Sequence, residues 1–242
     1  MKAIIMAAGV GSRLSKHFDG IPKCCIKFQG ESLIRRSVSI LNEYNINDIT
    51  IVVGYSKETI IKELHGKKVN FNYNPFYRVT NSIASLWFAR EKLIDDDEDV
   101  IIMNGDLFYE KQIIENVLSS EEVITLYADP RRISEADYRL NYKNGILLKY
   151  GKELSDSDTT GEYIGIAKIK NSILSKFSIL HNQLIDDEKY GMWWEDILYQ
   201  MSDSGGKISV EEIVNYFWSE IDYIEDYQRT LAYVGRKNDN KD

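Results

Sequence analysis

The sequence predicts an α/β fold with a mainly parallel sheet flanked by helices, and three observations lead to this prediction. Short apolar runs alternate with segments of helical apolar spacing through the first half of the 242 residues. An Asn-Gly pair between two alternating runs marks a hairpin in the second half. Hydrophobic residues make up 43% of the chain, which is enough for a sizeable core. We therefore expect a sheet built by the first half and a smaller subregion of hairpin and helices after it.

Five strands joined by helices are expected in the first half. The apolar run over 2–8 is typical of a buried strand, and further strands are expected over 48–55, 69–74, 99–108 and 121–128. Between them, apolar residues recur at helical spacing, which predicts helices over 32–46, 56–66, 81–94 and 111–120. Asn81 or Ser82 is the expected N-cap of the third of these helices. In such sheets, ligands bind beyond the carboxyl ends of the strands.

The second half of the chain changes in character at a hairpin. Asn144-Gly145 lies between two alternating runs within 138–154, which predicts a tight turn. Beyond it we expect a strand over 161–169, helices over 171–180 and 192–203, extended structure over 208–222 and a closing helix over 225–234. No composition break or linker separates the halves, so residues 1–242 are expected to form one domain.

Composition and charge exclude several classes of protein. The formal net charge of −8 argues against a nucleic-acid partner, because nucleic-acid binding needs a broad basic face. No apolar run approaches the roughly 20 residues that span a bilayer, so we expect neither membrane insertion nor a signal peptide. The only cysteines, Cys24 and Cys25, are adjacent and are expected to be packing residues of a reduced, cytoplasmic protein. The oligomeric state stays open, with a homodimer as one alternative.

A glycine-containing loop follows the first predicted strand, with two cations close behind it. Residues 9–14 read Gly-Val-Gly-Ser-Arg-Leu, and Pro22-Lys23 come next. Glycines let backbone N–H groups face an anion, and an arginine suits phosphate oxygens. The loop has neither the Walker A pattern nor the GxGxxG spacing of dinucleotide sites. Taken alone, it is equally typical of an ordinary tight turn.

Four motifs together resemble the signature of the nucleotidyltransferases that activate sugar phosphates and phosphocholine. They are AAGxGSRL at 7–14 with Pro22-Lys23 after it, Gly54-Tyr55, Asn104-Gly105-Asp106, and WxEIDxxxDY at 218–227. The resemblance covers nearly the whole chain and implies a Rossmann-like fold. It also implies the reaction, in which a substrate phosphate oxygen attacks the α-phosphorus of a nucleoside triphosphate and expels pyrophosphate. Both reactants are anions, so the site must screen their repulsion and hold them in line.

The resemblance implies roles in a nucleotide site. The backbone of residues 9–12 would cradle the phosphates, Arg13 would hold the β- and γ-phosphates, and Lys23 the α-phosphate. Asp106 and Asp222 would bind Mg²⁺, the expected cofactor, because hard carboxylate oxygens suit this ion, although a lone Asp is as often a cap or turn former. The nucleotide-binding half, 1–128, is expected to supply Ala7, Ala8, Gly9, Val10, Gly11, Ser12, Arg13, Lys23, Tyr55, Asn81, Ser82 and Gly105.

Within this family, the stretches 77–91, 190–198 and 218–228 resemble the small bacterial phosphocholine cytidylyltransferases. This similarity implies CTP and a small amine-bearing phosphate as substrates, for the decoration of cell-surface glycans or lipids. Lys152 is the expected catalytic cation at the phosphate of the acceptor, although a lysine at a strand end is usually just solvated. The acceptor-binding half, 129–242, is expected to supply Glu162, Trp193, Trp194, Glu195 and Asp196.

The adjacent tryptophans Trp193 and Trp194 are followed by two acids. Aromatic faces beside a carboxylate suit an ammonium group, although a sugar also stacks on tryptophan. Consecutive residues of a helix diverge by about 100°, so we expect one of the two rings in the core and the other at the site. A helix that simply packs on the sheet would also explain the pair.

Other functions stay open at this point. Arg131 and Arg132 would suit an acidic acceptor, so phosphonates with an amine and phosphorylated amino-acid derivatives are further candidates. A sugar-1-phosphate nucleotidyltransferase is the nearest enzymatic alternative, and a nucleotide-binding module without catalysis is the non-enzymatic one. A glycosyltransferase would normally carry a DxD metal motif, and Asp95-Asp96-Asp97 contains that string, but within an acidic loop.

Overall fold

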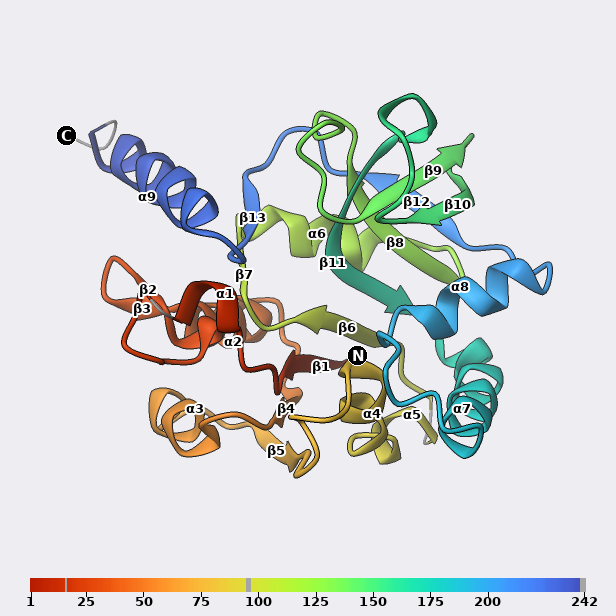
Figure 1. The fold of residues 1–242 in the computed structure, drawn as a ribbon, viewed down its shortest axis with the longest axis horizontal. Coiled ribbons are helices and arrows are strands. Elements are labelled where there is room, and N and C mark those ends of the chain that lie inside the picture. Colours follow the sequence, from red (N-terminus) through yellow and green to blue (C-terminus); the bar gives the residue numbers. More distant parts are fainter. Residues whose placement is uncertain (16, 95–96, 240–242) are drawn as a thin grey trace.

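The computed structural model describes residues 1–15, 17–94 and 97–239, without the side chains of Ser12, Ser15, Asn238 and Asp239. Among these residues, one nine-stranded sheet runs through the molecule in the order β5-β4-β1-β6-β11-β8-β12-β10-β9 (Figure 1). Its strands are β1 Lys2–Ala7, β4 Asp48–Val53, β5 Asn70–Tyr73, β6 Val100–Asn104, β8 Ile124–Asp129, β9 Arg139–Lys143, β10 Ile146–Gly151, β11 Gly161–Ile169 and β12 Ser209–Glu212.

The predicted α/β class is confirmed. Strands β5, β4, β1 and β6 form a parallel block, as the alternation of strands and helices predicts. Strand β11 is inserted antiparallel between β6 and β8, and β12 pairs parallel with β8. Strands β10 and β9 form the predicted hairpin, with Asn144 and Gly145 at φ values of 52° and 70°. Within the described sheet, only β11 and β10 run against the other strands.

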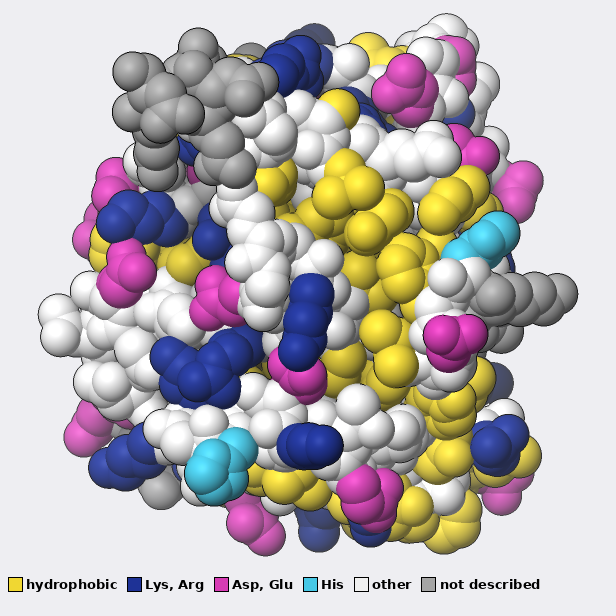
Figure 2. Space-filling model, turned by 90° about the vertical axis from the view of Figure 1, so that its left-hand side faces the viewer, with side chains coloured by type: hydrophobic (Ala, Val, Ile, Leu, Met, Phe, Trp, Pro, Cys, Tyr) yellow, Lys and Arg dark blue, Asp and Glu magenta, His cyan; other side chains and the backbone are white. Residues whose placement is uncertain are grey.

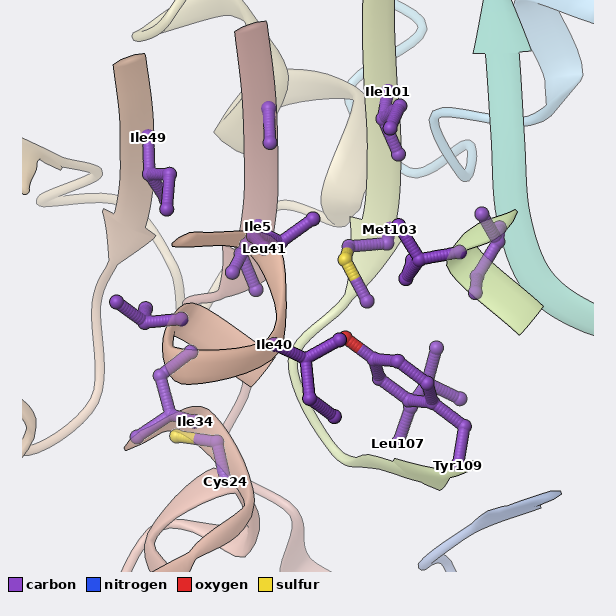
Figure 3. Close-up of a cluster of buried hydrophobic side chains, with 14 of the residues drawn as sticks. Ile5, Cys24, Ile34, Ile40, Leu41, Ile49, Ile101, Met103, Leu107 and Tyr109 are labelled. Carbon is purple, nitrogen blue, oxygen red and sulfur yellow. The ribbon is translucent and has the colours of Figure 1, made fainter. Parts of the chain in front are cut away.

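Helices cover both faces of this sheet (Figure 1). Helices α2 Leu33–Glu43, α3 Lys57–Glu63 and α6 Gln112–Ser119 pack on one face, together with Ile5 and Ile51 (Figure 3). Helices α4 Ser82–Trp87, α5 Glu91–Ile94, α7 Asn171–Asp186 and α8 Asp196–Asp203 pack on the other, together with Ile4 and Val52. Neighbouring residues of β1 and β4 therefore point to opposite cores, which explains why these strands are apolar throughout. None of the described helices is long and apolar enough to cross a membrane.

The last helix, α9 Ile224–Asp239, closes on the start of the chain. Val234 packs with Leu14, Ile26 and Phe28 in a small cluster of its own. Figure 2 shows a band of hydrophobic side chains on this side of the molecule. The short elements α1 Ser12–Ser15, the 3₁₀ turn η1 Lys23–Cys25, β2 Lys27–Phe28 and β3 Glu31–Ser32 lie here, and a second 3₁₀ turn, η2, spans Asp156–Asp158.

Some predicted elements have other bounds in the structure. The strand predicted over 99–108 divides into β6 and β7 Leu107–Tyr109, and the extended segment over 208–222 divides into β12 and β13 Trp218–Glu220. β7 and β13 pair with each other outside the main sheet. The helix predicted over 81–94 divides into α4 and α5, because tighter i→i−3 bonds over 88–90 interrupt it. Of the predicted acidic loop, residues 95 and 96 lie outside the described part of the chain.

Candidate active site

A cavity of about 300 Å³ opens at the carboxyl ends of β1 and β6. This is the edge at which parallel α/β sheets bind ligands. The loop after β1, the segment 77–85 around the start of α4, the end of β6, the segment 193–195 and the end of β13 all contribute to its walls. The lining residues are Met6, Ala8, Gly9, Lys23, Tyr77, Thr80, Asn81, Ser82, Ser85, Asn104, Asp106, Trp193, Glu195 and Glu220.

The loop after β1 offers bare backbone to the cavity. Within the described part of the chain, the N–H groups of Gly9, Val10 and Gly11 have no acceptor. A Cβ atom on Gly9 would have no other heavy atom within 4 Å, so the approach to this backbone is open. Unpaired successive N–H groups are the arrangement that binds phosphate oxygens. Ala7 and Gly105 line a smaller cavity of about 90 Å³ that shares Gly9, Lys23 and Asp106 with the larger one.

Lys23 lies among three carboxylates at the base of the cavity. Its Nζ forms an ion pair with Asp222 and is 3.6 Å from Oδ2 of Asp106. One oxygen each from Asp106, Glu220 and Asp222 lie within 4.8 Å of one another. The sequence predicts two of these acids as metal ligands, and the structure brings them together with a third, Glu220.

Burial, together with neighbouring acids, disfavours the ionised forms of Asp106 and Glu220. Burial and the charge of Asp222 raise the pKa of Asp106 to about 6, although Lys23 opposes this. Burial and both neighbouring acids raise the pKa of Glu220 well above its ordinary value. Burial lowers the pKa of Lys23, but Asp106 and Asp222 outweigh it and hold that pKa above its usual range. Three hard oxygen donors with one lysine as counter-charge fit a divalent cation such as Mg²⁺.

Sequence reasoning missed Glu220, although a signal for it was present. Glu220 and Asp222 are two residues apart in a segment predicted to be extended, so their side chains point to the same side. The pairing of β13 with β7 places Glu220 opposite Leu107, directly after Asp106. Nδ2 of Asn104 donates to Oε1 of Glu220 at 3.0 Å, which holds this carboxylate in the group.

The other nucleotide-site residues lie at different depths. Arg13 is exposed and does not line the cavity; its guanidinium donates to the Tyr223 hydroxyl at 2.8 Å and lies 3.8 Å from Asp222. Val10 is half-buried, and of Ser12 only the backbone is described. The hydroxyl of Tyr55 donates to the Gly20 carbonyl at 2.8 Å, and Tyr77 lines the cavity in its place.

Asn81 and Ser82 connect the nucleotide half to the segment that carries the tryptophans. Asn81 caps α4, as predicted, by accepting a hydrogen bond from the backbone N–H of Ser82 at 2.8 Å. Its amide also donates to the Gly191 carbonyl at 3.2 Å. Oγ of Ser82 accepts from the backbone N–H of Trp194 at 2.9 Å. The start of α4 therefore fixes the opposite wall of the cavity.

The two tryptophans separate into a core and a cavity position, but both precede α8 and do not lie in the helix predicted over 192–203, so the turn before α8 and not helical spacing separates them. Trp193 is 42% exposed and lines the cavity, whereas Trp194 is wholly buried. Glu195 also lines the cavity, and burial followed by the nearby charge of Asp196 raises its pKa to about 8. Asp196 accepts from the backbone N–H of Trp193 at 2.8 Å and so shapes the turn before α8.

Lys152 and Glu162 lie beside the cavity and do not line it. Nζ of Lys152 is 2.7 Å from Oδ2 of Asp137 and 5.4 Å from the ring centroid of Trp193. Glu162 forms an ion pair with Arg132 and accepts from the backbone N–H of Asp137 at 2.8 Å. Glu162 and Arg132 line a neighbouring cavity of about 170 Å³, which shares Glu220 with the main one.

Arg131, the other arginine of this loop, points elsewhere. It forms a two-pronged pair with the buried Asp129, with both distances at 2.8 Å. Each of the two loop arginines is thus engaged by a carboxylate of the protein itself.

Comparisons with known proteins agree with this geometry. Residues 3–136 match the MobA-like NTP transferase domain. The chain is 25% identical to the CTP:phosphoglutamine cytidylyltransferase of Campylobacter jejuni, over 94% of this chain and 98% of that protein. It is 27% identical to the choline-phosphate cytidylyltransferase of Streptococcus pneumoniae, over 99% and 100% of the two chains. The solved CTP:phosphocholine cytidylyltransferase of S. pneumoniae superposes with a TM-score of 0.79 at 22% identity, covering 96% of this chain and 98% of the other.

Proposed function

The chain belongs to the family of MobA-like NTP transferase domains and is a nucleotidyltransferase, and within that family we propose a Mg²⁺-dependent cytidylyltransferase. It transfers CMP from CTP to a small amine-bearing phosphate and releases pyrophosphate. In this proposal residues 1–242 form one cytoplasmic domain, with the nucleotide in the half 1–128 and the acceptor in the half 129–242. The product, a CDP-linked amine, serves the decoration of cell-surface glycans or lipids.

One observation supports the proposal: a single cavity combines groups suited to a triphosphate with groups suited to an ammonium. Backbone N–H groups that have no acceptor among the described residues contribute to its lining together with Lys23, and so do the ring of Trp193 and the carboxyl of Glu195. The lining carries one lysine against three carboxyl groups, those of Asp106, Glu195 and Glu220. Such a surface favours a cationic group on the acceptor, and a well-placed ring adds roughly 0.5–2 kcal/mol of cation–π attraction.

In the proposed reaction, each charged residue of the site has a separate role. A phosphate oxygen of the acceptor forms a bond to the α-phosphorus of CTP while the bond to the β-phosphate oxygen breaks, and pyrophosphate takes the electron pair. Lys23 neutralises charge that develops on the α-phosphate oxygens, and Arg13 holds the leaving phosphates. Lys152, freed from Asp137, meets the acceptor's phosphate. Asp106, Glu220 and Asp222 would hold Mg²⁺, which supplies further charge neutralisation when it is bound.

We propose the chemical class of the acceptor and not a single compound. The relatives named above act on choline phosphate and on phosphoglutamine, and both acceptors combine a phosphoryl group with a nitrogen-bearing body. Burial keeps a proton on Glu195 at neutral pH, and an ammonium group beside it would favour its ionised form. Arg131 and Arg132 are already paired with buried acids, which supports an amine over a further carboxylate as the recognised group.

The test is pyrophosphate release from CTP, UTP, ATP and GTP, each crossed with several acceptors, with Mg²⁺ or with EDTA. The acceptors are phosphocholine, phosphoethanolamine, 2-aminoethylphosphonate, phosphoglutamine and glucose 1-phosphate. Turnover that requires CTP, Mg²⁺ and an amine-bearing acceptor is expected. Turnover with glucose 1-phosphate alone would replace the proposal with sugar activation, and nucleotide binding without any turnover would indicate a non-catalytic module.

A pair of substitutions tests the ammonium site directly. Trp193→Phe keeps an aromatic face, whereas Trp193→Leu keeps only apolar bulk. We expect the KM for the acceptor to rise roughly tenfold more in the leucine variant, with the KM for CTP unchanged in both. Equal effects of the two substitutions on the acceptor KM would contradict recognition through the ring.

A further inference from the structure

Asn104, the last residue of β6, connects the two sides of the cavity through one amide group. Its Nδ2 donates to Oε1 of Glu220 at 3.0 Å, and its Oδ1 accepts from Nε1 of Trp194 at 3.2 Å. Trp194 is wholly buried, yet its chain neighbours Trp193 and Glu195 both line the cavity. The buried indole of Trp194 is therefore linked by two hydrogen bonds to Glu220. Glu220 is one of the three clustered acids Asp106, Glu220 and Asp222, called the acidic group below.

The chemistry of the three side chains fixes the direction of these bonds. An indole N–H can only donate, so the atom of the Asn104 amide that faces Trp194 must be the oxygen. The amide of Asn104 must therefore turn its oxygen toward Trp194 and its nitrogen toward Glu220. An aspartate at position 104 would present a charge to Glu220, and an aliphatic residue would leave both partners without a bond.

The Asn104 amide is closely packed against β11. Gly165 of β11 has a φ of +78°, and a Cβ there would lie 3.0 Å from Nδ2 of Asn104 and 3.3 Å from Cδ2 of Leu107. The other end of the connection is also fixed, because the backbone N–H of Trp194 donates to Ser82. Little space is left for the amide to rotate while the indole bond is in place.

We propose that Trp194 and Asn104 are positioning residues that set the orientation of the Glu220 carboxylate in the metal site. The proposal rests on the metal-dependent function proposed above. It implies that binding of the acceptor affects the metal site. Trp194 lies between Trp193 and Glu195, so a shift of this segment when the acceptor binds moves the indole and, through Asn104, the carboxylate. The acceptor pocket and the metal site are thereby coupled.

Mn²⁺ binding to the free protein, followed by the electron paramagnetic resonance signal of unbound Mn²⁺, tests the proposal without turnover. Trp194→Phe removes the indole N–H and keeps an aromatic ring in the core. Asn104→Leu removes both hydrogen bonds at a partly exposed position, and serves if the first variant does not fold. The matched control is Trp87→Phe, because the indole N–H of Trp87 has no partner among the described residues and its ring lines a groove outside the site.

Loss of a residue that orients a metal ligand typically weakens metal binding by 10- to 100-fold. We expect Trp194→Phe and Asn104→Leu each to weaken Mn²⁺ binding roughly tenfold, and the double variant to be no weaker than the stronger single one. Trp87→Phe should match the wild type. Unchanged binding in Trp194→Phe and Asn104→Leu would overturn the positioning role and leave the metal site standing. A wild-type protein that binds no Mn²⁺ would overturn the metal site itself, and with it this proposal.

Discussion

Lys23 reaches the acidic group because residue 11 has no side chain. A Cβ on Gly11 would lie 2.6 Å from Cγ of Lys23 and 3.0 Å from its Cδ and Cε. Gly11 also has a φ of +62°, a region that other residues adopt only at a cost. The second glycine of the loop therefore has two functions: it gives the backbone its turn, and it leaves the path along which the lysine side chain lies.

Gly11→Ala should consequently displace Lys23. We expect kcat/KM for CMP transfer to fall roughly a hundredfold, as small misplacements of reacting groups do. The free energy of unfolding should fall by about 1–2 kcal/mol, because alanine is strained at this φ. Steady-state kinetics and urea unfolding measure the two effects.

The matched control is Gly235→Ala in α9, where a Cβ would have no other heavy atom within 4 Å. Alanine favours the helix over glycine by roughly 0.5–1 kcal/mol, so this variant should be slightly more stable and fully active. A Gly11→Ala enzyme with wild-type kcat/KM would show that catalysis does not depend on this path of Lys23.

The sequence predicts most of the residues that line or adjoin the candidate site, and it misses those that depend on contacts between distant parts of the chain. Asp106 and Asp222 meet because Asp106 lies in the turn between β6 and β7, and Asp222 follows β13, the strand that pairs with β7. Glu220 is not predicted, because the β7–β13 pairing that places it joins residues far apart in the chain. Tyr55 follows β4 as expected, but its hydroxyl is engaged by the Gly20 carbonyl, a contact that no local pattern encodes.

At the scale of elements, α7 is joined to α4 by a buried histidine. Nε2 of His181 lies 2.9 Å from the carbonyl oxygen of Ile83 and acts as the donor when the ring is neutral. Its Nδ1 has no partner among the described residues. Burial is the main cause that lowers the pKa of His181 to about 4, and Arg90 adds to the effect. Burial, and not this hydrogen bond, therefore favours the neutral ring between the two helices, because the bond to Ile83 by itself would raise the pKa.

This makes part of the stability depend on pH. The unfolded chain takes up a proton at His181 near pH 6.5, whereas the folded chain does so only near pH 4. Stability is therefore lost as the pH falls from about 6.5 to 4, by up to about 3 kcal/mol at the lower end. His181→Gln retains a donor for Ile83 and should remove this part of the slope in urea unfolding at pH 7, 6 and 5. An identical slope in the variant would contradict the assignment.

Local patterns predict the elements better than their pairing. Every strand of the parallel block lies where an apolar run predicts it, and Asn144-Gly145 forms the turn of its hairpin. The run over 161–169 is predicted to the residue, but its antiparallel insertion between β6 and β8 is not. Strand propensity depends on local side chains, whereas the neighbour and direction of β11 depend on contacts distant in sequence.

At the scale of the molecule, Lys23 and the three acids of the acidic group bring together residues from the beginning, middle and end of the chain. Lys23 comes from the start, Asp106 from the end of β6, and Glu220 and Asp222 from the segment before α9. Without a metal, three carboxylates share one lysine, so the group opposes the folding that brings it together. Such stored repulsion is common where a site is built for a ligand, and the ligand then stabilises the fold.

Mg²⁺ should therefore raise the melting temperature of the free protein. At 100 times its dissociation constant a ligand adds about 2.7 kcal/mol, which corresponds to roughly 5–10 °C for a chain of this size. Differential scanning calorimetry with and without Mg²⁺, at matched ionic strength, measures the shift. Glu220→Gln should melt higher than the wild type without metal, because the fold no longer buries an ionisable carboxyl group beside two other acids, yet gain less than half the wild-type shift with Mg²⁺. The control Glu225→Gln removes an exposed charge at the start of α9 and should keep the full shift. If Glu220→Gln also shows the full Mg²⁺-dependent shift in melting temperature, Glu220 is not a metal ligand. Only Asp106 and Asp222 would then remain as ligands.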